Sequence, residues 1–406
     1  MRRAGRRDVS RSTLALALLL TAACDALLTE APDDGDLLDA PLPGLTAEEQ
    51  AAFLRGDEEF GRAFSVAEGL GPIFNGVSCA SCHSGDGRGR PENALSRFGE
   101  PPDMARPLGG PQLQDRAIPG AVPERLPEGH AVSLRLPPPV FGVGLIEAIP
   151  DEEILSREDP DDADGDGISG RANRVLPPDW VTATEPGAGP GPAVGRFSRK
   201  AQVSTLLQQV VEAYHQDIGI TSDFQPEENV NPLTGADTRS ADRVPDPEVP
   251  EAAVRAVLDY IRFLAPPRPG DVTGERLRGR DLFHDVGCAS CHTPVLRTGP
   301  HRVEALALRD VRLYSDLLLH DMGDGLADGR GDGAADGREW RTAPLWGLRV
   351  MRDFLDGEAF LMHDGRARSV EEAVLLHGGE AEASRAAFAA LPEGDRGALL
   401  SYVESR

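Results

Sequence analysis

Apolar residues recur at helical spacing in several segments of the chain. Residues 48–70 contain Ala, Glu and Phe without a proline, and residues 250–264, 273–284 and 394–404 each place apolar residues on one face of a helix. The buried stripes of these last three segments would be Val254, Val257, Leu258, Ile261 and Leu264; then Leu277, Leu282 and Phe283; and then Leu399, Leu400 and Val403. No alternation of apolar and polar residues is long enough for a substantial sheet. The pattern predicts a mainly α-helical protein with extensive loops.

Proline and glycine mark where the helices are interrupted. Residues 84–139 are dense in Gly, Pro and Arg and predict long loops. The run Ala-Pro-Pro-Arg-Pro-Gly at 265–270 ends the preceding helix and gives a domain boundary near residue 268. At 406 residues the chain is long enough for two domains. We expect an N-terminal domain with loop insertions over 48–268 and a C-terminal domain over 269–406, closed by its last helix.

The N-terminus has the pattern of a secretory signal. An arginine-rich start precedes the apolar residues 14–23, which are fewer than the roughly 20 that a membrane-spanning helix needs. Small residues before Cys24 resemble a bacterial lipobox, in which this sulfur is lipidated after cleavage; the alternative is an ordinary signal in which Cys24 is incidental. We therefore expect a lipoprotein signal over 1–24, a flexible tether over 25–47, and an exported periplasmic protein anchored to the membrane by its N-terminal lipid.

Charge narrows the range of partners. The chain has 67 acidic and 42 basic residues and a net charge of −25, and 40 % of its residues are hydrophobic, as in a soluble globular protein. This charge disfavours nucleic acid and an anionic membrane surface, so contact with a membrane is expected only through the lipid anchor. A basic redox protein would be steered towards such a surface, although acidic composition also serves solubility.

Two copies of the pentapeptide Cys-Ala-Ser-Cys-His account for four of the five cysteines. They comprise Cys79, Cys82 and His83, and Cys288, Cys291 and His292. Two thiols three positions apart reach the two vinyl groups of one haem, and the adjacent histidine reaches the iron from the proximal side. The spacing therefore predicts two haem c groups with His83 and His292 as proximal ligands.

Other uses of paired cysteines explain this pattern less well. A four-cysteine zinc site does not require a histidine after each pair, and a thioredoxin-like dithiol needs a βαβ context that neither copy has. A disulfide is the remaining alternative. Export agrees with haem attachment, which takes place outside the cytoplasmic membrane. Because a helix precedes each motif, we expect two cytochrome c-like haem domains.

Further stretches resemble one family of haem proteins. They are Asn-Gly-Val-Ser-Cys-Ala-Ser-Cys-His at 75–83, Pro-Pro-Val-Phe-Gly-Val-Gly-Leu-Ile-Glu-Ala-Ile-Pro at 138–150, Asp-Ala-Asp-Gly-Asp-Gly-Ile-Ser-Gly-Arg at 162–171, Leu-His-Asp-Met-Gly at 319–323, Thr-Ala-Pro-Leu-Trp-Gly-Leu at 342–348 and His-Asp-Gly-Arg-Ala at 363–367. Together they resemble the di-haem oxidoreductases called thiol oxidoreductases, which are related to bacterial dihaem cytochrome c peroxidases. The resemblance implies one haem that takes electrons from a small donor and a second haem at which peroxide or another substrate reacts.

The distal ligand of the second haem follows from this resemblance. In the peroxidase pattern a His-x-Gly motif is followed fourteen residues later by a distal Met, and here the corresponding residues are His363 and His377. This predicts ligation of the second iron by His292 and His377. The alternative is that His377 caps a helix end, with Met362 or Met351 as the ligand.

Three other residues of the second half are candidates for the haem site. His363 and Arg366 are predicted to hydrogen-bond haem propionates, with a structural role in the loop as the alternative. His320 is a candidate distal ligand or a group at the interface between the haems.

The first haem has no obvious second ligand. The next histidine after His83 is His130, farther than peroxidases place their displaceable ligand. By resemblance, Glu147 falls where peroxidases carry an acid–base glutamate; an apolar surrounding would raise its pKa and let it shuttle a proton. A solvent-exposed carboxylate at a helix start is the alternative. Trp340 and Trp346 are either an electron relay between the haems or core residues.

An acidic loop resembles a calcium site in part. Asp162, Asp164, Asp166 and Gly167 follow the alternating-oxygen pattern, but position twelve is Asn173 instead of the closing Glu, so a complete EF-hand is excluded. The candidates are a calcium ion held with other groups or a solvated turn. The later run 324–336 is similar in composition and predicts a flexible acidic loop.

Two functions remain after these arguments. The first is a dihaem oxidoreductase in which electrons from a small redox protein or a membrane donor enter at the His292 haem and a small-molecule oxidant is reduced at the His83 haem. The second is a pure electron carrier in which both irons have six ligands. An open or cyanide-binding haem would distinguish the enzyme from the carrier.

Overall fold

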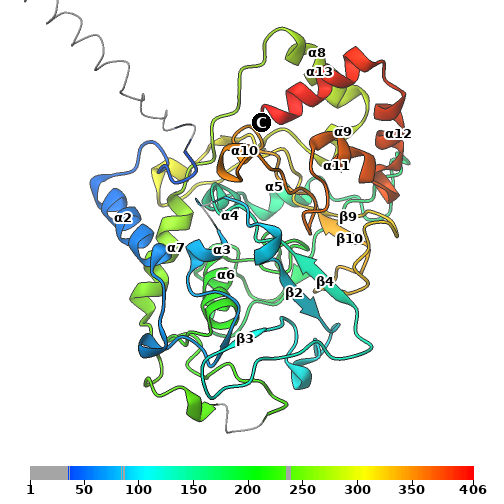
Figure 1. Ribbon diagram of the computed structural model, residues 1–406. Helices are drawn as coiled ribbons and strands as arrows, with labels where there is room; N and C mark the ends of the chain where they lie inside the picture. Colours follow the sequence, from blue (N-terminus) through cyan, green and yellow to red (C-terminus); the bar gives the residue numbers. More distant parts are fainter. Residues whose placement is uncertain (1–34, 36, 84, 86, 235–238) are drawn as a thin grey trace, which may run out of the picture.

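The computed structural model describes residues 35, 37–83, 85, 87–234 and 239–406. The predicted signal segment, Cys24 and the start of the tether lie outside these residues. The described part is mainly helical with little sheet, which confirms the predicted class (Figure 1). Within it, no helix combines the length and the apolar character needed to cross a membrane.

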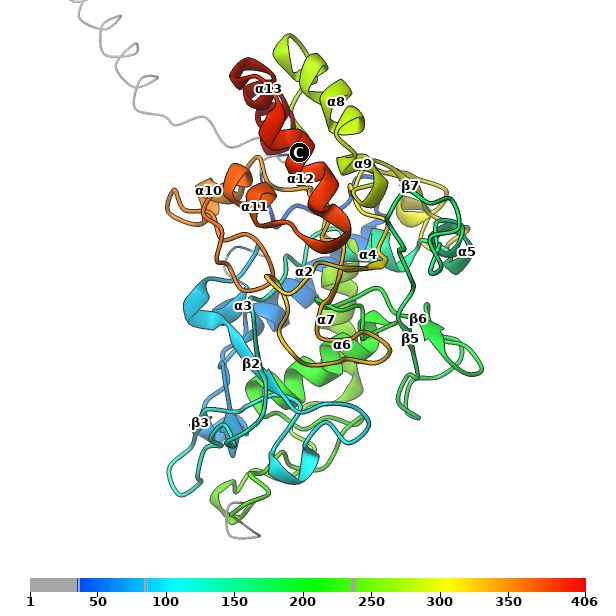
Figure 2. The same cartoon turned by 90° about the vertical axis from the view of Figure 1, so that its right-hand side faces the viewer.

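Two crossing helices close the first half of the molecule. Helix α2 (Ala47–Gly61) lies against α7 (Glu251–Phe263), and the two are adjacent in Figures 1 and 2. The rings of Phe53 and Phe60 lie 4.9 and 5.2 Å from that of Tyr260. At the crossing, a Cβ on Gly56 would collide with the backbone oxygen of Ala256, so glycine permits the close approach.

Helix α2 is shorter than the predicted helix over 48–70. It begins with a capping box between Thr46 and Glu49 and ends at Gly61. Ser65 and Glu68 then form a second capping box around a short 3₁₀ turn, Val66–Glu68. Side chains that bond the local backbone thus start a new element where the composition alone had suggested a continuous helix.

The second half repeats the crossing arrangement. Helices α8 (Glu275–Asp285) and α13 (Glu393–Glu404) pack together, and a Cβ on Gly279 would collide with the backbone oxygen of Ala398. Phe283 packs edge-on against Tyr314 and Tyr402. This confirms the predicted packing of the last helix on the helix that contains Leu282, and Figure 2 shows both helices at the top of the molecule.

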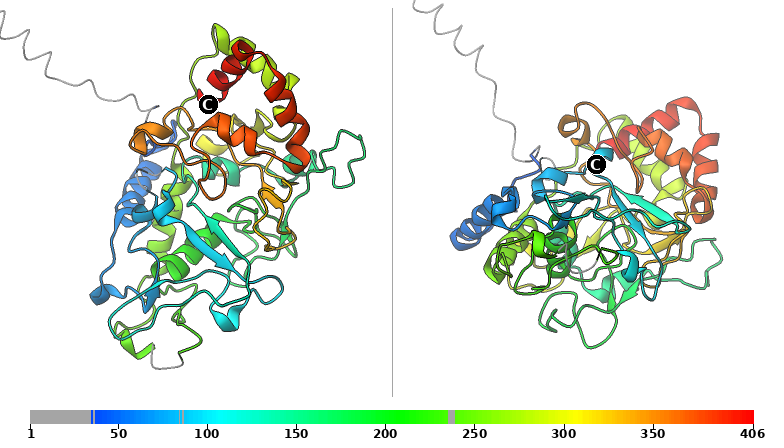
Figure 3. Two further views of the ribbon diagram at one scale, coloured as in Figure 1. Left: turned by 45° about the vertical axis from the view of Figure 1, so that its right-hand side comes forward. Right: turned by 60° about the horizontal axis from the view of Figure 1, so that its bottom comes forward.

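The remaining elements are short and connected by long loops (Figure 3). The helices are α3 (Cys79–Cys82), α4 (Val143–Glu147), α5 (Asp151–Leu155), α6 (Leu206–Glu212) with its π-helical continuation η6 (Ala213–Ile218), α9 (Cys288–Cys291), α10 (Met351–Phe354), α11 (Val370–Leu376) and α12 (Glu382–Ala390). The 3₁₀ turns besides Val66–Glu68 are Pro91–Asn93, Arg106–Leu108, Arg239–Ala241, Glu304–Leu306 and Gly379–Ala381.

The strands form antiparallel two-stranded ribbons. The pairs are β1 (Ile73–Phe74) with β3 (Arg116–Ala117), β2 (Leu95–Phe98) with β4 (Val132–Arg135), β5 (Arg174–Val175) with β6 (Ala193–Val194), β7 (Leu296–Arg297) with β8 (Asp310–Val311), and β9 (Leu319–Asp321) with β10 (Glu339–Arg341). In the longest pair, β2 and β4, Leu95 lies opposite Arg135 and Phe98 opposite Val132. Each ribbon fixes one loop and leaves the fold dominated by helices.

The buried core follows the predicted division only in part. One cluster contains α2, α6 and α7, and a second contains α8, α11 and α13. However, Leu296, Leu306, Leu318 and Trp346 belong to the first cluster although they follow residue 268. The chain therefore returns to the first core after the proline-rich segment, and the division into 48–268 and 269–406 stays a prediction.

Two segments predicted to be flexible are packed. Leu38, Leu42 and Leu45 are buried, and the Leu42 amide donates to the Phe263 carbonyl at 2.7 Å, so apolar packing fixes the last part of the predicted tether over 25–47. In the acidic run 324–336, the Asp328 carboxylate pairs with Lys200 at 2.8 Å. Buried ion pairs thus replace the expected flexible acidic loop.

The ion pairs of this run belong to one network. Asp332 pairs with Arg135 and with Arg330, each at 2.6 Å, and these three side chains are almost wholly buried. The network fixes residues 328–332 against β4, and Arg135 extends from it towards the first CxxCH motif.

Candidate functional sites

Each CxxCH motif forms one turn of helix. In α3 the Ser78 hydroxyl caps the helix by accepting from the Ser81 amide at 3.0 Å, and His83 is the C-terminal cap. Helix α9 has the same form, with His292 at its end. The four cysteines of the motifs are free. One turn of helix thus brings both sulfurs and the imidazole to one cavity in each half.

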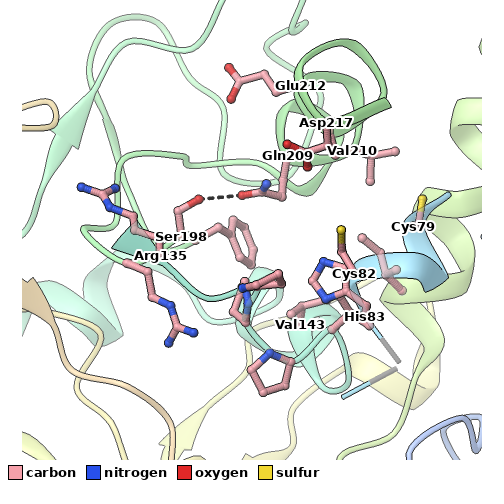
Figure 4. A pocket seen from close by; sticks show the side chains of 18 of the residues that line it. Cys79, Cys82, His83, Arg135, Val143, Ser198, Gln209, Val210, Glu212 and Asp217 are labelled. Atoms are coloured by element: carbon pink, nitrogen blue, oxygen red, sulfur yellow. Dashed lines mark hydrogen bonds between the residues drawn. The ribbon is translucent and has the colours of Figure 1, made fainter. Parts of the chain in front are cut away.

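The first cavity lies beside α3. It encloses about 1750 Å³ of empty space, part of it open to solvent, and its lining includes Cys79, Cys82 and His83. Figure 4 shows these three residues along one side of the cavity. Burial lowers the pKa of His83 to about 4, so its imidazole is neutral and able to bind a metal. Val257 and Ile261 of α7 line the apolar side.

The second cavity lies beside α9. It encloses about 1420 Å³, again partly open, and its lining includes Cys288, Cys291 and His292. The Nδ1 atom of His292 lies 3.0 Å from the Tyr314 carbonyl, which orients the ring and leaves Nε2 for a metal. Burial lowers the pKa of His292 to about 4. The arrangement is that of a proximal ligand with its supporting carbonyl.

Burial disfavours the thiolate form of Cys79 and Cys288. Burial is the largest cause that raises the pKa of Cys79 and of Cys288 to about 12. A zinc site or a dithiol redox centre requires thiolates, which electropositive surroundings stabilise. The two cavities therefore do not favour those alternatives, whereas thioether bonds to haem consume the thiols and need no negative charge.

Three arginines line both cavities, of which Arg88 and Arg199 are buried and Arg341 is partly buried. Arg88, Arg199 and Arg341 line both cavities, and none of them forms an ion pair within the described residues. Their hydrogen bonds go to backbone carbonyls, such as that of Leu136, which accepts from Arg199 at 2.8 Å. Burial, and repulsion from the neighbouring arginines, lower the pKa of Arg199 well below its usual value.

Buried cations without anions require anionic ligands. The propionates of a haem in each cavity would supply them, and guanidinium groups bind carboxylates in two-point geometry. The residues present thus fit two haems in three respects: paired thiols, neutral imidazoles and uncompensated arginines. The sequence pattern does not indicate these arginines, because they lie far apart in the chain and share no motif.

The segment 340–346 forms a partition between the cavities. Trp346 lines the first cavity and Trp340 the second, and Ala343 and Pro344 between them line both. Trp340 stacks on His363 with ring centroids 3.8 Å apart and an interplanar angle of 9°. The two tryptophans therefore lie between the sites, as the relay hypothesis requires, and both are also buried.

Potential iron ligands are distributed unequally. Within the described lining of the first cavity, His83 is the only histidine and no methionine is present. The second cavity also contains His377, Met322 and Met362, whereas Met351 is not among its lining residues. The Nδ1 atom of His377 lies 2.7 Å from the Ala373 carbonyl at the end of α11, which leaves Nε2 free. Capping the helix and binding iron are therefore compatible roles for His377.

Polar groups from α6 and η6 form another wall of the first cavity. Figure 4 shows Gln209, Glu212 and Asp217 there, with the Ser198 hydroxyl donating to the Gln209 amide oxygen at 2.7 Å. Burial raises the pKa of Glu212, and it raises the pKa of Asp217 to about 6. Asp217 can therefore exchange a proton near neutral pH. The sequence does not indicate these groups, because no motif in it places this helix beside the first CxxCH motif.

One family model matches most of the chain. A model described as "Di-haem oxidoreductase, putative peroxidase" matches residues 27–96 and 124–406. The chain belongs to the di-haem oxidoreductase family. This confirms the resemblance found in the sequence, and it supports two haems and a redox function for the enzyme. No curated protein matches the chain.

Two solved structures show a distant likeness to the chain. One is hydrazine synthase of Kuenenia stuttgartiensis under xenon pressure, with 15 % identity, a TM-score of 0.40, and coverage of 93 % of this chain and 95 % of that one. The other is a MauG-like protein associated with microbial copper homeostasis, with 16 % identity, a TM-score of 0.32, and coverage of 66 % and 88 %. Both likenesses are too distant to indicate a function for this di-haem oxidoreductase.

His320 is not available as an iron ligand in this di-haem oxidoreductase. Its Nε2 lies 2.9 Å from an Asp316 oxygen and its Nδ1 lies 2.8 Å from a Glu380 oxygen. Burial alone would lower the pKa of His320, but hydrogen bonds to Asp316, Cys291 and Glu380 raise it well above its usual value. The structure therefore disfavours His320 as a distal ligand, because both ring nitrogens contact carboxylates. His320 lines the second cavity, and its alternative role at the interface between the haems stays a prediction.

Glu147 is also placed differently from the prediction. Its carboxylate accepts from Arg262 at 2.6 and 3.2 Å, and neither residue lines the first cavity. Helix α4 directs Val143 and Ile146 to the cavity and Glu147 towards α7. The proposed acid–base role is contradicted, because this carboxylate neutralises a buried arginine 115 residues away in the chain.

The two predicted propionate-binding residues, His363 and Arg366, lie in different surroundings. His363 is buried and lines the second cavity, where it stacks on Trp340. Arg366 is exposed, pairs with Asp364 at 2.7 Å and is not among the lining residues of either cavity. A role for Arg366 in binding propionate is therefore contradicted, because its charge is already neutralised outside the cavity.

The candidate calcium loop is only partly assembled. Oxygens of Asp159, Asp162 and Asp164 lie within 4.8 Å of one another, and Asp166 is not part of this group. Backbone amides already donate to these side chains; for example, the Gly167 amide donates to Asp162 at 3.1 Å. Calcium binding by this loop stays a prediction.

Proposed function

We propose that this di-haem oxidoreductase is an exported c-type cytochrome that takes electrons at the His292 haem and reduces a small oxidant such as peroxide at the His83 haem. The observation that carries the proposal is the difference between the cavities. The second offers His377 and two methionines as a second iron ligand, whereas the described lining of the first offers no histidine or methionine besides His83. Haems that only transfer electrons have six ligands, and a catalytic haem keeps an open position.

The chain would hold each haem through its own CxxCH motif. Cys79 and Cys82 would form the thioethers in the first cavity, and Cys288 and Cys291 those in the second. When bound, the two haems supply one-electron redox chemistry and, at the open iron, a position for the oxidant. Arg88, shared by both cavities, would bind propionate.

The first cavity also contains groups suited to proton transfer. Reduction of hydrogen peroxide to two water molecules consumes two electrons and two protons. Asp217, with its pKa at about 6, can exchange a proton near neutral pH, and Glu212 has a raised pKa. These two residues replace Glu147 as the candidates for acid–base chemistry.

Electron transfer between the haems is supported by the partition between the cavities. Trp346 lines the first cavity and Trp340 the second, and Ala343 and Pro344, which lie between them in the chain, line both. Electrons from a small redox protein or a membrane donor would enter at the second haem. The signal segment and Cys24 would direct the protein to the periplasm and attach it to a membrane through lipid.

Electron paramagnetic resonance of the haem-loaded protein tests the proposal. After expression in a host that matures c-type cytochromes, we expect a mass increase for two haems, one low-spin signal, and one signal that changes when cyanide is added. Replacing Cys79 and Cys82 by Ala should remove the cyanide-sensitive signal, and replacing Cys288 and Cys291 by Ala should remove the low-spin signal. Two low-spin haems that are inert to cyanide would instead establish the electron carrier.

A further inference from the structure

A second cluster of carboxylates lies outside both haem cavities. It is in the loop between η6 and α7, where oxygens of Glu228, Asp246 and Glu248 lie within 4.8 Å of one another. The Asp242 carboxylate is close enough to repel Glu228 electrostatically. Four acidic side chains therefore gather within the segment between η6 and α7, whose two ends lead to helices that line the first cavity.

Three of these carboxylates each have one buried oxygen without a hydrogen-bond partner. Glu228 is only 8 % exposed and its Oε2 accepts no hydrogen bond, and the same holds for Glu248 Oε1 and Asp242 Oδ2. No arginine or lysine forms an ion pair with any of the four within the described residues. The nearby Arg239 pairs instead with the exposed Glu227 at 3.6 Å. An unpaired buried carboxylate is costly, so the site requires a proton or a cation.

Without a cation the protons would be held tightly. Burial, followed by repulsion from Glu248, Asp246 and Asp242, raises the pKa of Glu228 to about 9. Burial raises the pKa of Glu248 to about 7, although Thr221 donates to this carboxylate through its amide and its hydroxyl. A divalent cation would displace these protons and neutralise the charge directly.

We propose that Glu228, Asp246 and Glu248 bind a calcium ion. Calcium bonds oxygen at about 2.3–2.6 Å, so one ion spans ligand oxygens up to about 5 Å apart, as the three carboxylates require. The ligands are all oxygens, which disfavours zinc. Magnesium demands octahedral geometry and retains several waters, whereas calcium accepts several carboxylates in flexible geometry.

The ion would join the two ends of the loop. Thr221 follows η6 and Glu248 precedes α7, and the Val249 amide donates to the Thr221 carbonyl at 3.2 Å. Helix α7 places Val257 and Ile261 on the wall of the first cavity. Calcium at this position would therefore stabilise the junction between two walls of that cavity without contacting the haem.

Calorimetric titration of the haem-loaded protein with calcium chloride, after removal of metals with EDTA, tests this site. At pH 7.5 we expect a saturable calcium-binding event at this cluster, because its three carboxylates and the unpartnered, buried Oε2 of Glu228 offer a site made only of oxygens. E228Q should lose this event or weaken it by about tenfold or more, and magnesium should bind less tightly than calcium.

A matched control separates this cluster from the other acidic loop. D164N removes a carboxylate from the group around Asp159 and should retain the binding event of the Glu228 cluster like the wild type. Gln at position 228 resembles the protonated acid, so E228Q should fold, as an unchanged visible haem spectrum and haem content would show. The proposal is overturned if calcium up to about 5 mM gives no binding event, if E228Q binds like the wild type, or if D164N loses the event.

Discussion

Replacing Glu147 by Gln distinguishes a structural ion pair from a catalytic acid. The side chains of Glu147 and Arg262 are 1 % and 3 % exposed and are joined by hydrogen bonds of 2.6 and 3.2 Å. The amide preserves the shape of the carboxylate and removes its charge, which leaves the Arg262 guanidinium uncompensated in the interior. Breaking a buried pair on one side costs about 3–5 kcal/mol.

The expected loss lies near the lower end of this range. Asp259 is a second carboxylate, 3.5 Å from Arg262, that retains part of the compensation. With an unfolding entropy of about 2.1 cal/mol/K per residue, a loss of about 3 kcal/mol over 406 residues lowers the unfolding midpoint by roughly 4 °C. D395N, which breaks the exposed pair between Arg278 and Asp395, should shift the midpoint much less.

Thermal unfolding followed by circular dichroism, together with peroxide turnover at a temperature well below the transition, provides the assay. We expect E147Q to unfold at a lower temperature and to retain turnover. An unchanged midpoint with turnover reduced a hundredfold or more would refute the reasoning, because a general acid typically contributes about 10²–10⁴-fold to the rate. Glu147 would then act on the substrate despite its position outside the cavity.

Three further predictions concern His377, Glu380 and Arg199. H377A should change the low-spin spectrum of one haem only, and an unchanged spectrum rejects His377 as a ligand. Burial alone would raise the pKa of Glu380, but hydrogen bonds from His320 and Ser169 hold it at about 2. Because this pKa lies below the unfolded value of about 4.5, the stability that the carboxylate confers is lost as pH falls from 4.5 towards 2. E380Q should therefore flatten this part of the curve of unfolding free energy against pH. R199Q should lower the reduction potential of at least one haem in spectroelectrochemical titration, since a buried cation favours the reduced state, whereas R366Q, outside both cavities, should leave the potentials unchanged.

The helices were predictable from the sequence because their signals are local. The apolar stripe over 250–264 and the proline-rich stop after it correspond closely to α7, Glu251–Phe263. The CxxCH spacing likewise indicated both cavities, since one turn of helix brings two sulfurs and an imidazole together. Where side chains such as Ser65 bond the adjacent backbone, as after α2, apolar periodicity misplaced the end of the helix.

The partners of individual charged residues were not predictable. The apolar run around Glu147 suggested a raised pKa, but the carboxylate meets Arg262 from a distant helix. His320 and Arg366 fell within family-like stretches, yet their charges are neutralised by carboxylates. In each case the decisive contact joins residues brought together by the tertiary fold, which hydrophobic pattern and motif spacing do not encode. The same reason hid Arg199 and the other arginines shared by the cavities.

At each of the two helix crossings, a glycine sets how closely the two helices approach, and this distance would determine how far water enters the haem cavity of that half. Helices α2 and α7 both contribute to the first cavity, through Phe60 and Val257, and α8 and α13 do the same for the second. A methyl group at Gly56 or Gly279 would push one helix away from its partner and widen the apolar rim of that cavity alone. Because solvent exposure influences haem potential, a substitution at either crossing would change the driving force between the two haems without altering a residue that lines either cavity.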